Sequence, residues 1–571
     1  MQHQFFPVPP REGDEGLEEP PRGPYLRVVP LGGCGEIGRN MTVYETNDDI
    51  VVVDAGVQFP EEEMLGVDLV INDVTYLRER ASKIRGLLLT HAHEDHVGGV
   101  PYFLAQLPVP VYATDVTIAL LRGKLKEHKL LESADLHVIE PGEEIHLGAI
   151  RAEFISITHS VAGSCSLALN TPLGTVIHTG DFKFDQTPID GRPSDIATLA
   201  RYGEDGVLLL CSDSTNAEIP GHTPSERIVG ETFKDIFAHS VGRIIVTMFA
   251  SNVPRLQQTV DAAAAYDRKV CFVGRSMLNV SNIAIEHGYL TLAPGQQIRE
   301  HELDDYPHDK LVICTTGSQG EPTSALVRMA ARDHRRVKLV SGDTVILSAT
   351  PIPGNERSIG RTINNLFKLG VDVIYGRRRM AHVSGHGCQE ELLTMLNLTK
   401  PEYFMPVHGE YRMLVQHANL AQQTGFDAAR IFVVENGDAI QFTPSSAQRV
   451  GRIYGGPVYV DGLGVGDVGE VVLRDRKHLS IDGMLVVTVT VDSMDGKVLA
   501  GPDITTRGFA YGEGALLDDV RHAAADIMES GAREGLTEWT AIREHVHKGL
   551  QKFIYDRTKR RPMIVPVVME V

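Results

Sequence analysis

Apolar and polar positions alternate along this chain in three different ways. Between about residues 25 and 220, short apolar runs separated by glycine-rich turns are typical of strands with few helices between them. From about 225 to 375, amphipathic stretches of helical period alternate with apolar runs, which predicts a mostly parallel sheet with helices on its faces. From about 390 the alternation continues to a glycine-rich stretch, residues 455–469, that precedes a last α+β unit. The pattern predicts an α/β protein of several domains.

The same periodicities predict the individual elements. In the first stretch we expect strands at residues 25–29, 41–45, 50–53, 154–158 and 175–178. In the second we expect helices at 225–238 and 253–266, and strands at 243–248, 269–273, 310–314 and 336–340. In the third we expect helices at 390–396 and 411–424, and strands at 402–406 and 431–434. The last unit is expected to contain strands at 485–491 and 563–568 and helices at 515–529 and 539–555.

A glycine-rich motif follows the first of these strands. Residues 33–38 match the GxGxxG pattern of dinucleotide-binding folds, and an acidic residue, Asp54, follows at a fitting distance. Such a fold requires a helix that starts at Gly38, whereas residues 40–45 have the pattern of a strand. We therefore interpret the motif as a turn within a β-meander.

The composition is that of an ordinary globular protein. The 571 residues, 42% of them hydrophobic, are enough for about two to four domains. Residues 1–23 are rich in proline and acidic side chains, which predicts a disordered tail rather than a signal peptide. No apolar run approaches the roughly 18 residues that span a membrane, so no membrane association is expected. The six cysteines form no CxxC pair, which is typical of buried free thiols in a reducing cytoplasm.

The formal net charge of −20 argues against indiscriminate binding of nucleic acid, which normally leaves a basic footprint. A nucleic acid held in one local groove is compatible with this charge. Three short basic clusters are present: Arg335-Arg336, Arg377-Arg378-Arg379 and Lys559-Arg560-Arg561. Each is interpreted as a solvated face, with a phosphate-binding track as the alternative.

The densest chemistry lies in residues 91–96, where His91, His93, Asp95 and His96 directly follow an apolar strand pattern. Imidazole and carboxylate are the ligands that zinc and similar divalent ions prefer. His91 and His93 are expected to point the same way at the strand end, and Asp95 and His96 to serve a second ion beside the first.

Asp54, His159 and Asp181 each follow a further predicted strand. Taken in order with residues 91–96, they resemble the metallo-β-lactamase superfamily, which implies an αββα sandwich. After Asp213 the α/β segment intervenes, and His386 and His408 follow it, an arrangement that resembles the β-CASP nuclease branch. The strings Ser-Gly-His-Gly at 384–387 and Pro-Val-His-Gly-Glu-Tyr-Arg at 406–412 most resemble the bacterial ribonuclease J family.

This resemblance implies a metallo-β-lactamase αββα sandwich with an inserted β-CASP α/β domain and a C-terminal α+β domain. The implied boundaries are a tail at 1–23, a metallo-β-lactamase domain at 24–222 and 386–455, a β-CASP domain at 223–385, a linker at 456–478 and a C-terminal domain at 479–571.

The resemblance also implies roles for individual residues. One ion is expected on His91, His93 and His159, and a second on Asp95, His96 and His408, with Asp181 bridging the two. Asp54 and Asp213 are expected to orient ligand imidazoles, as partners of metal ligands do. Asp95, Asp181 and His386 are the expected catalytic residues, and His386 is expected to contact the scissile phosphate and protonate the leaving oxygen. RNA phosphates are expected on two segments, one comprising Ala250, Ser251 and Asn252 and the other His382, Val383, Ser384, Gly385 and His386. A further structural ion is implied near Asp68 and Asp461.

The expected function is that of a ribonuclease with 5′-to-3′ exonuclease and endonuclease activity on single-stranded RNA carrying a 5′-monophosphate. Two divalent ions, Zn or Mn, would hydrolyse the phosphodiester and leave 5′-phosphates, in rRNA processing and mRNA decay. A homodimer or homotetramer and membership of an RNA-degradation complex are implied. The alternatives are a small-molecule metallo-hydrolase of thioesterase or lactonase type, which needs no insertion and no His386, and a non-catalytic scaffold.

Overall fold

The computed structural model describes residues 4–5, 16–61, 63–351, 355–376, 379–492, 497–509, 515–534, 536 and 538–571. The chain forms two compact units, one made mainly of Val8–Phe59 and Leu69–Val458, and the other of His3–Pro7, Pro60–Asp68 and Tyr459–Val571. Most of the tail expected to be disordered, namely residues 1–3 and 6–15, lies outside the described residues, as do Arg377 and Arg378 of one basic cluster.

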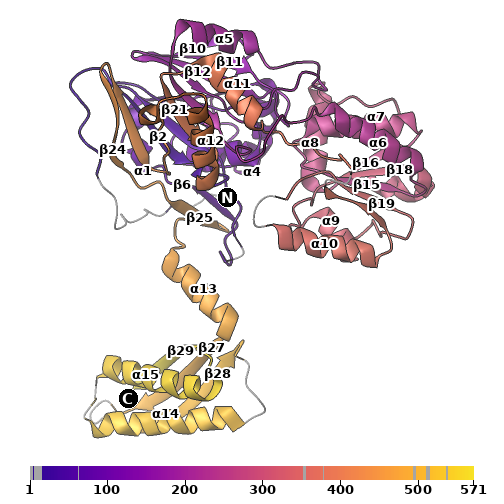
Figure 1. Cartoon of the computed structure of the whole chain (residues 1–571). Helices are drawn as coiled ribbons and strands as arrows, with labels where there is room; N and C mark the ends of the chain where they lie inside the picture. The colour runs from indigo at the N-terminus through magenta and orange to yellow at the C-terminus, as the bar shows by residue number, and fades with distance from the viewer. Residues whose placement is uncertain are drawn as a thin grey trace. The chain divides into compact units, whose positions relative to one another are not determined.

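Two sheets face each other in the larger unit (Figure 1). The first contains, in order, β24 (Ser446–Arg452), β23 (Asp438–Thr443), β2 (Leu26–Gly32), β4 (Met41–Glu45), β5 (Ile50–Val53), β7 (Ile84–Leu88), β8 (Val111–Ala113) and β9 (Leu136–Val138). The second contains β10 (Glu144–Leu147), β11 (Ile150–Ser156), β12 (Cys165–Thr171), β13 (Gly174–His178), β14 (Val207–Asp213) and β21 (Tyr403–Val407). Apolar side chains from both inner faces, such as Val51 and Phe154, form the core between the sheets.

Helices cover the outer face of each sheet. α3 (Val100–Gln106) and α4 (Asp115–Glu127) pack on the first, and α5 (Ile196–Asp205), α11 (Gln389–Thr399) and α12 (Tyr411–Gln423) on the second. These layers confirm the expected αββα sandwich. β4 starts at Met41, so residues 33–38 connect two antiparallel strands and open no helix; within them, β3 (Cys34–Gly35) pairs with β22 (Gly409–Glu410).

A six-stranded sheet is inserted between β14 and α11 (Figure 1). All its strands run parallel, in the order β17 (Gln297–Ile298), β16 (Lys269–Val273), β18 (Leu311–Thr315), β15 (Ile244–Thr247), β19 (Thr344–Leu347) and β20 (Asp372–Ile374). One face packs on α6 (Arg227–His239), α7 (Val253–Ala265) and α8 (Arg275–Glu286), and the other on α9 (Ala325–Ala330) and α10 (Glu356–Lys368). Burial on both faces explains the unbroken apolar runs in these strands.

Two expected strands are wrong. Residues 336–340 form a loop, and the neighbouring strand of the sheet is β19. The alternation there arises because Val337 and Leu339 are buried in the core beneath α9, while the Val340 N–H is bonded by the carboxylate of Asp343 rather than by another strand. Residues 431–434 make only a single bridge, between Ile431 and Phe404. The helices of the first stretch, α1 (Thr75–Arg78), α2 (Glu94–Val97), α3, α4 and α5, were not among the expected elements.

The C-terminal unit contains a three-stranded sheet with β27 (Met484–Val491) between β28 (Val498–Arg507) and β29 (Met563–Glu570). α14 (Ala515–Arg533) and α15 (Trp539–Thr558) cover one face (Figure 1). The strand β28 was not expected, because its exposed side chains give little apolar alternation. The segment expected to be a linker contains β25 (Pro457–Asp461), β26 (Gly464–Val465) and most of α13 (Glu470–Asp482), and Gln4–Phe5 pairs in parallel with β26.

All six cysteines are buried and unpaired, as expected. Of the helices in the described part of the chain, none has both the length and the hydropathy to span a bilayer.

Candidate metal centre

Six strands from both sheets bring polar residues to one edge of the sandwich. β5 and β7 run parallel in one sheet, and β13, β14 and β21 run parallel in the other. β11 has the same direction as β13, because each is antiparallel to β12. The carboxyl ends of these strands lead into Asp54, His91, His159, Asp181, Asp213 and His408. Residues that are up to 354 positions apart in sequence therefore share one site.

The first cluster consists of His91, His93, His159 and Asp181. Nε2 of His91 lies 3.0 Å from Nδ1 of His93, which in turn lies 3.1 Å from Nε2 of His159. Oδ2 of Asp181 is 3.6 Å from the His91 nitrogen and 3.7 Å from the His159 nitrogen. Three ring nitrogens and one carboxylate oxygen thus face the same small space.

The second cluster consists of Asp95, His96, His408 and again Asp181. Nε2 of His96 is 3.3 Å from Oδ2 of Asp181, and Nε2 of His408 is 3.4 Å from the other oxygen, Oδ1. Asp95 Oδ2 closes the group at 3.3 Å from Nε2 of His408. The carboxylate of Asp181 therefore belongs to both clusters.

These donors fit divalent metal. Oδ1 of Asp181 is buried and has no hydrogen-bond partner, although buried polar atoms are nearly always bonded. Ring nitrogens of His91, His93 and His159 converge at 3.0 and 3.1 Å, where unprotonated nitrogens repel each other unless a proton or a metal cation lies between them. A cation in each cluster would satisfy both features, and nitrogen with carboxylate is the donor set of zinc and related ions.

A second layer of hydrogen bonds fixes which nitrogen each ring presents. Nδ1 of His96 donates to Oδ2 of Asp54 at 2.7 Å, and Nδ1 of His159 donates to the Gly385 carbonyl at 2.8 Å. Nδ1 of His408 lies 2.7 Å from the Thr215 hydroxyl. Each bond leaves Nε2 of that ring facing the clusters, which is how partners of ligand histidines act in metalloproteins.

Asp54 itself is held in a strained conformation, with φ of +62°. Its two oxygens also accept hydrogen bonds from the backbone N–H and the hydroxyl of Thr90, both at 2.8 Å. The carboxylate thereby links the end of β5 to the loop that carries His91 and orients His96 at the same time.

The charge environment differs between the two clusters. Burial lowers the pKa of His93 to about 4 and, with the neighbouring His96, holds the pKa of His91 well below its usual value. Burial also lowers the pKa of His159. For His96 burial acts in the same direction, but Asp181, Asp95 and Asp54 outweigh it and raise the pKa to about 10. Burial likewise acts to lower the pKa of His408, but Asp181, Asp213 and Asp95 outweigh it and raise that pKa well above its usual value. Without metal, the first cluster therefore favours neutral imidazole and the second favours protonated imidazole.

His386 lies beside both clusters without belonging to the first. Its Nδ1 donates to Oδ2 of Asp213 at 2.8 Å, and its Nε2 lies 4.0 Å from Oδ2 of Asp181. Burial lowers the pKa of His386, but Asp213 and Asp181 outweigh it, so that the net shift is upward. The ring is therefore a proton donor held at the edge of the site.

The two segments expected to bind RNA phosphates meet at one buried arginine. Arg255, on α7, is fully buried and pairs through two parallel bonds with Glu226, at 2.9 and 2.8 Å. It also donates to the carbonyl of Val383 at 3.1 Å and to Nδ1 of His382. Burial and this guanidinium lower the pKa of His382, so that its ring is neutral and keeps its proton on Nε2.

The backbone of Arg255 also contacts the segment 250–252. Asn252 caps α7, and its side-chain oxygen accepts a hydrogen bond from the Arg255 N–H at 3.1 Å. On the far side of the loop, the Asn216 amide donates to the Ser384 hydroxyl at 3.0 Å and to the His386 carbonyl at 2.8 Å. Residues 250–252 and 382–386 are thus held by a common set of side chains.

Gly385 must be glycine for the loop to reach the metal centre. A Cβ at this position would lie 2.6 Å from Cε1 of His159 and 2.8 Å from the Ser160 hydroxyl. No real Cβ atom comes so close to a ring, so any larger residue would push the loop away from His159.

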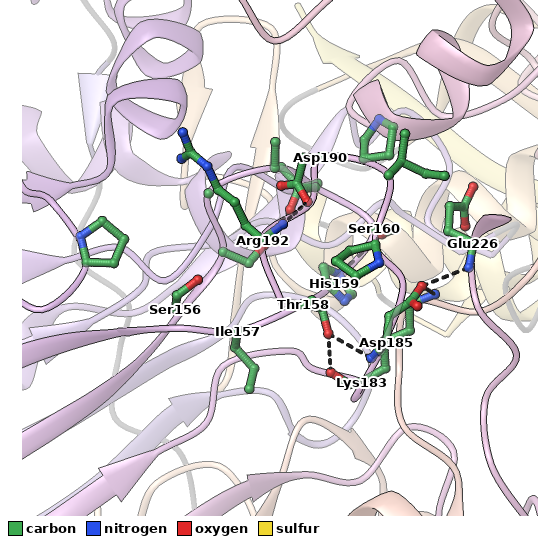
Figure 2. Close-up of a pocket in the computed structure, with 18 residues that line it drawn as sticks. Ser156, Ile157, Thr158, His159, Ser160, Lys183, Asp185, Asp190, Arg192 and Glu226 are labelled. Carbon is green, nitrogen blue, oxygen red and sulfur yellow. Dashed lines mark hydrogen bonds and ion pairs between the residues drawn. The ribbon is translucent and has the colours of Figure 1, made fainter. Parts of the chain in front are cut away.

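A pocket with a cavity volume of about 60 Å³ opens beside His159 (Figure 2). Figure 2 shows Lys183, Asp185 and Glu226 along one side of it, with the Thr158 hydroxyl donating to the Lys183 carbonyl. This volume has room for a few water molecules and is smaller than that of typical pockets for organic ligands.

The structure leaves Asp68 and Asp461 outside these clusters. Both belong to the C-terminal unit, where Oδ2 of Asp68 accepts from the Gly462 N–H at 2.8 Å and Oδ2 of Asp461 accepts from Arg476 at 2.5 Å. Sequence reasoning also missed Asn40, whose amide lies 3.1 Å from Nε2 of His96 and donates to the Asp95 carbonyl at 3.0 Å. No local pattern marks Asn40, since it follows the misleading glycine motif.

Fold and site together define a metallo-hydrolase with an inserted domain, and sequence models of known families agree. Residues 34–275 match the metallo-beta-lactamase superfamily, and residues 370–432 match the Zn-dependent metallo-hydrolase RNA specificity domain. Residues 241–366 match the ribonuclease J beta-CASP domain, and residues 471–571 match the ribonuclease J C-terminal domain.

Curated relatives match over almost their whole length. Ribonuclease J2 of Bacillus subtilis (strain 168) is 43% identical over 96% of this chain and 99% of its own. Ribonuclease J of Thermus thermophilus is 42% identical over 98% of this chain and 97% of its own. A crystal structure of a protein of unknown function from Enterococcus faecalis V583 shares the fold, with a TM-score of 0.53 at 16% identity over 73% of this chain and 100% of that one.

The chain belongs to the ribonuclease J family. This confirms the resemblance drawn from residues 54–412 and supports a metal-dependent ribonuclease that uses divalent metal and acts on RNA. A thioester or lactone hydrolase is not favoured.

Proposed function

We propose that this protein is a two-metal ribonuclease that degrades single-stranded RNA from a 5′-monophosphate end and also cuts internally, leaving 5′-phosphates. The observation that carries this proposal is the carboxylate of Asp181, shared by two nitrogen-rich clusters, with the Asp213–His386 pair beside it. Two adjacent cation sites and a separate proton donor are what hydrolysis of a phosphodiester requires.

The proposed ligands are those of the two clusters, with His91, His93 and His159 on one ion, Asp95, His96 and His408 on the other, and Asp181 on both. When bound, Zn or Mn ions would activate water and neutralise the phosphate charge. The low pKa values of His91, His93 and His159 keep these rings unprotonated and ready to bind at neutral pH.

His386 is the proposed general acid. The leaving ribose oxygen needs a proton, and the upward shift of the His386 pKa keeps the ring protonated near neutral pH. Asp213 fixes the ring through Nδ1, so that Nε2–H faces the reacting phosphate. Asp95 and Asp181 would hold the ions and, as carboxylates, accept the proton that the attacking water loses.

The 5′-phosphate is proposed to lie between residues 250–252 and 382–386. His382 offers Nε2–H as a donor because Arg255 occupies its Nδ1. The Ser384 hydroxyl accepts from the Asn216 amide and the His386 N–H and can donate its own hydrogen to an anionic end group.

Several finer expectations join this proposal. We infer domain boundaries near residues 222, 385, 455 and 478, a homodimer or homotetramer, a place in rRNA processing and mRNA decay in the cytoplasm, and a structural ion near Asp68 and Asp461 if Arg476 is displaced from Asp461.

One experiment tests the core of the proposal. A single RNA prepared with 5′-monophosphate, 5′-triphosphate and 5′-hydroxyl ends is incubated with protein and with Mn, Zn or Mg. We expect metal-dependent release of 5′-mononucleotides, fastest from the monophosphate, together with internal fragments. Absence of any metal-dependent cleavage would refute the ribonuclease assignment, and equal rates on all three ends would refute the 5′-phosphate site.

A further inference from the structure

The C-terminal unit carries a strongly basic surface that the metal centre does not use. Residues 548–561 contain six lysines and arginines and one aspartate, in a chain whose formal net charge is −20. Lys548, Lys552 and Tyr555 are spaced four and three residues apart near the end of α15, so they follow one face of the helix, and Lys559 follows directly as its C-terminal cap. Arg560 and Arg561 continue the surface beyond the helix.

Most of these cations have no carboxylate partner. Lys548 pairs with Glu544 at 2.6 Å, and Arg557 pairs with Asp519 on α14. Within the described part of the chain, the side chains of Lys552, Lys559, Arg560 and Arg561 make no ion pair, and all four are exposed. The only carboxylate bonded to this stretch from α13 is Asp482, which accepts from the Arg561 backbone N–H at 2.9 Å.

An exposed aromatic ring organises the patch. Lys559 Nζ lies 5.1 Å and Arg561 Cζ lies 4.6 Å from the ring centroid of Tyr555, of which 36% is exposed. Contact with the ring face holds both cations near each other despite their mutual repulsion. Two adjacent cations beside a partly exposed ring match a phosphate backbone with bases that can stack.

We propose that Lys552, Tyr555, Lys559, Arg560 and Arg561, the α15 basic patch, bind the phosphodiester backbone of RNA. This rests on the proposed function, because the reason for such a patch is the substrate. A protein of charge −20 repels a polyanion at long range, and a local basic patch offsets that repulsion by releasing counterions from the strand. The patch would then add affinity only for RNA long enough to reach it.

The test compares two variants of equal charge change. In the patch variant Lys552, Lys559, Arg560 and Arg561 are each replaced by Gln. In the control variant the exposed Arg332, Arg335, Arg336 and Lys338 of the inserted domain are each replaced by Gln. Binding of a labelled 40-nucleotide and a labelled 5-nucleotide RNA is measured by anisotropy between 50 and 200 mM KCl, in a His386→Ala background that prevents cleavage. Thermal melts confirm that all variants fold.

We expect the patch variant to lower the slope of log affinity against log salt for the long RNA by about 3, since each contact with single-stranded RNA contributes about 0.7. Binding of the long RNA at the lowest salt should weaken at least tenfold, and binding of the short RNA should not change. An unchanged slope for the long RNA, or an equal change in the control variant, would overturn the proposal.

An altered oligomeric state with unaltered RNA affinity would also overturn it, because the patch would then bind protein. Failure of the proposed function gives a different result, in which the unsubstituted protein cleaves neither RNA in the presence of metal.

Discussion

Replacing Arg255 by Met separates the two tasks that this residue performs. Methionine keeps the apolar stem and removes the guanidinium, which makes two bonds to Glu226 and one each to Ser348, His382 and Val383. The Glu226 carboxylate, whose side chain is only 8% exposed, would be left without its charge partner. Breaking a buried pair in this way destabilises a protein by about 3–5 kcal/mol.

The same change should impair binding of the RNA end. Without Arg255, nothing fixes the Nδ1 side of His382 or the Val383 carbonyl, and the donors of residues 382–386 lose their placement. A hydrogen bond to a charged group contributes about 1.5–3 kcal/mol, so losing one such bond to the 5′-phosphate raises KM for 5′-monophosphorylated RNA by at least about tenfold. KM for 5′-hydroxyl RNA should change much less.

The matched control is Arg243→Met. Arg243 also makes a two-bond buried pair, with Asp343 at 3.0 and 2.6 Å, but contacts none of residues 382–386. Urea unfolding should show comparable destabilisation for both variants, whereas only Arg255→Met should raise KM for monophosphorylated RNA. If both variants raise KM alike, or neither does, Arg255 does not position the loop.

Three further predictions concern the metal centre. Asp181→Asn should leave fewer than one ion per subunit by elemental analysis and lower activity by at least about a thousandfold, because both clusters lose their shared carboxylate. Retention of two ions would contradict the assignment of Asp181. Gly385→Ala should weaken metal binding by about 10- to 100-fold, measured by competition with a chelator, because its Cβ would displace His159. Gly387→Ala is the control in the same loop, and equal effects of the two substitutions would contradict a role for the contact with His159. Metal affinity should rise as pH rises from 6 to 8, by up to about a hundredfold per unit, because the pKa of His96 is raised to about 10, that of His408 is raised well above its usual value, and the second ion must displace a proton from each ring. Calorimetry that shows no pH dependence would argue against His96 and His408 as ligands.

Local spacing was enough to predict part of the site. Residues 91–96 are contiguous and run from the end of a strand into the short helix Glu94–Val97, and Asp54 and Asp181 follow strands that the apolar pattern marks clearly. His408 lies 313 positions from Asp95, and no periodicity links two such distant segments, so only family resemblance placed it. The sequence did not indicate a role for Arg255. An arginine among the apolar positions of a helix only weakens the amphipathic pattern, and its buried partners cannot be read from the sequence.

The errors in the fold have a common origin. The alternation at 336–340 shows which side chains are buried, but not whether a neighbouring strand is present to accept hydrogen bonds. In α4, the β-branched Val116, Thr117 and Ile118 favour a strand locally, and packing of the helix against the first sheet overrides that preference. Burial is encoded locally, whereas the choice of backbone partner depends on tertiary context.

The bond from Nδ1 of His159 to the Gly385 carbonyl joins a proposed metal ligand directly to the loop that is proposed to bind RNA. If the bond couples metal binding to RNA binding, each ligand must change the affinity for the other by the same factor, because coupling between two binding equilibria is reciprocal. If an ion on His159 stiffens residues 382–386 and tightens RNA binding by some factor, then RNA slows the loss of that ion by strengthening its binding by the same factor. Such an enzyme would bind its metal more tightly when RNA is bound, and would lose the metal more easily when it is free of RNA.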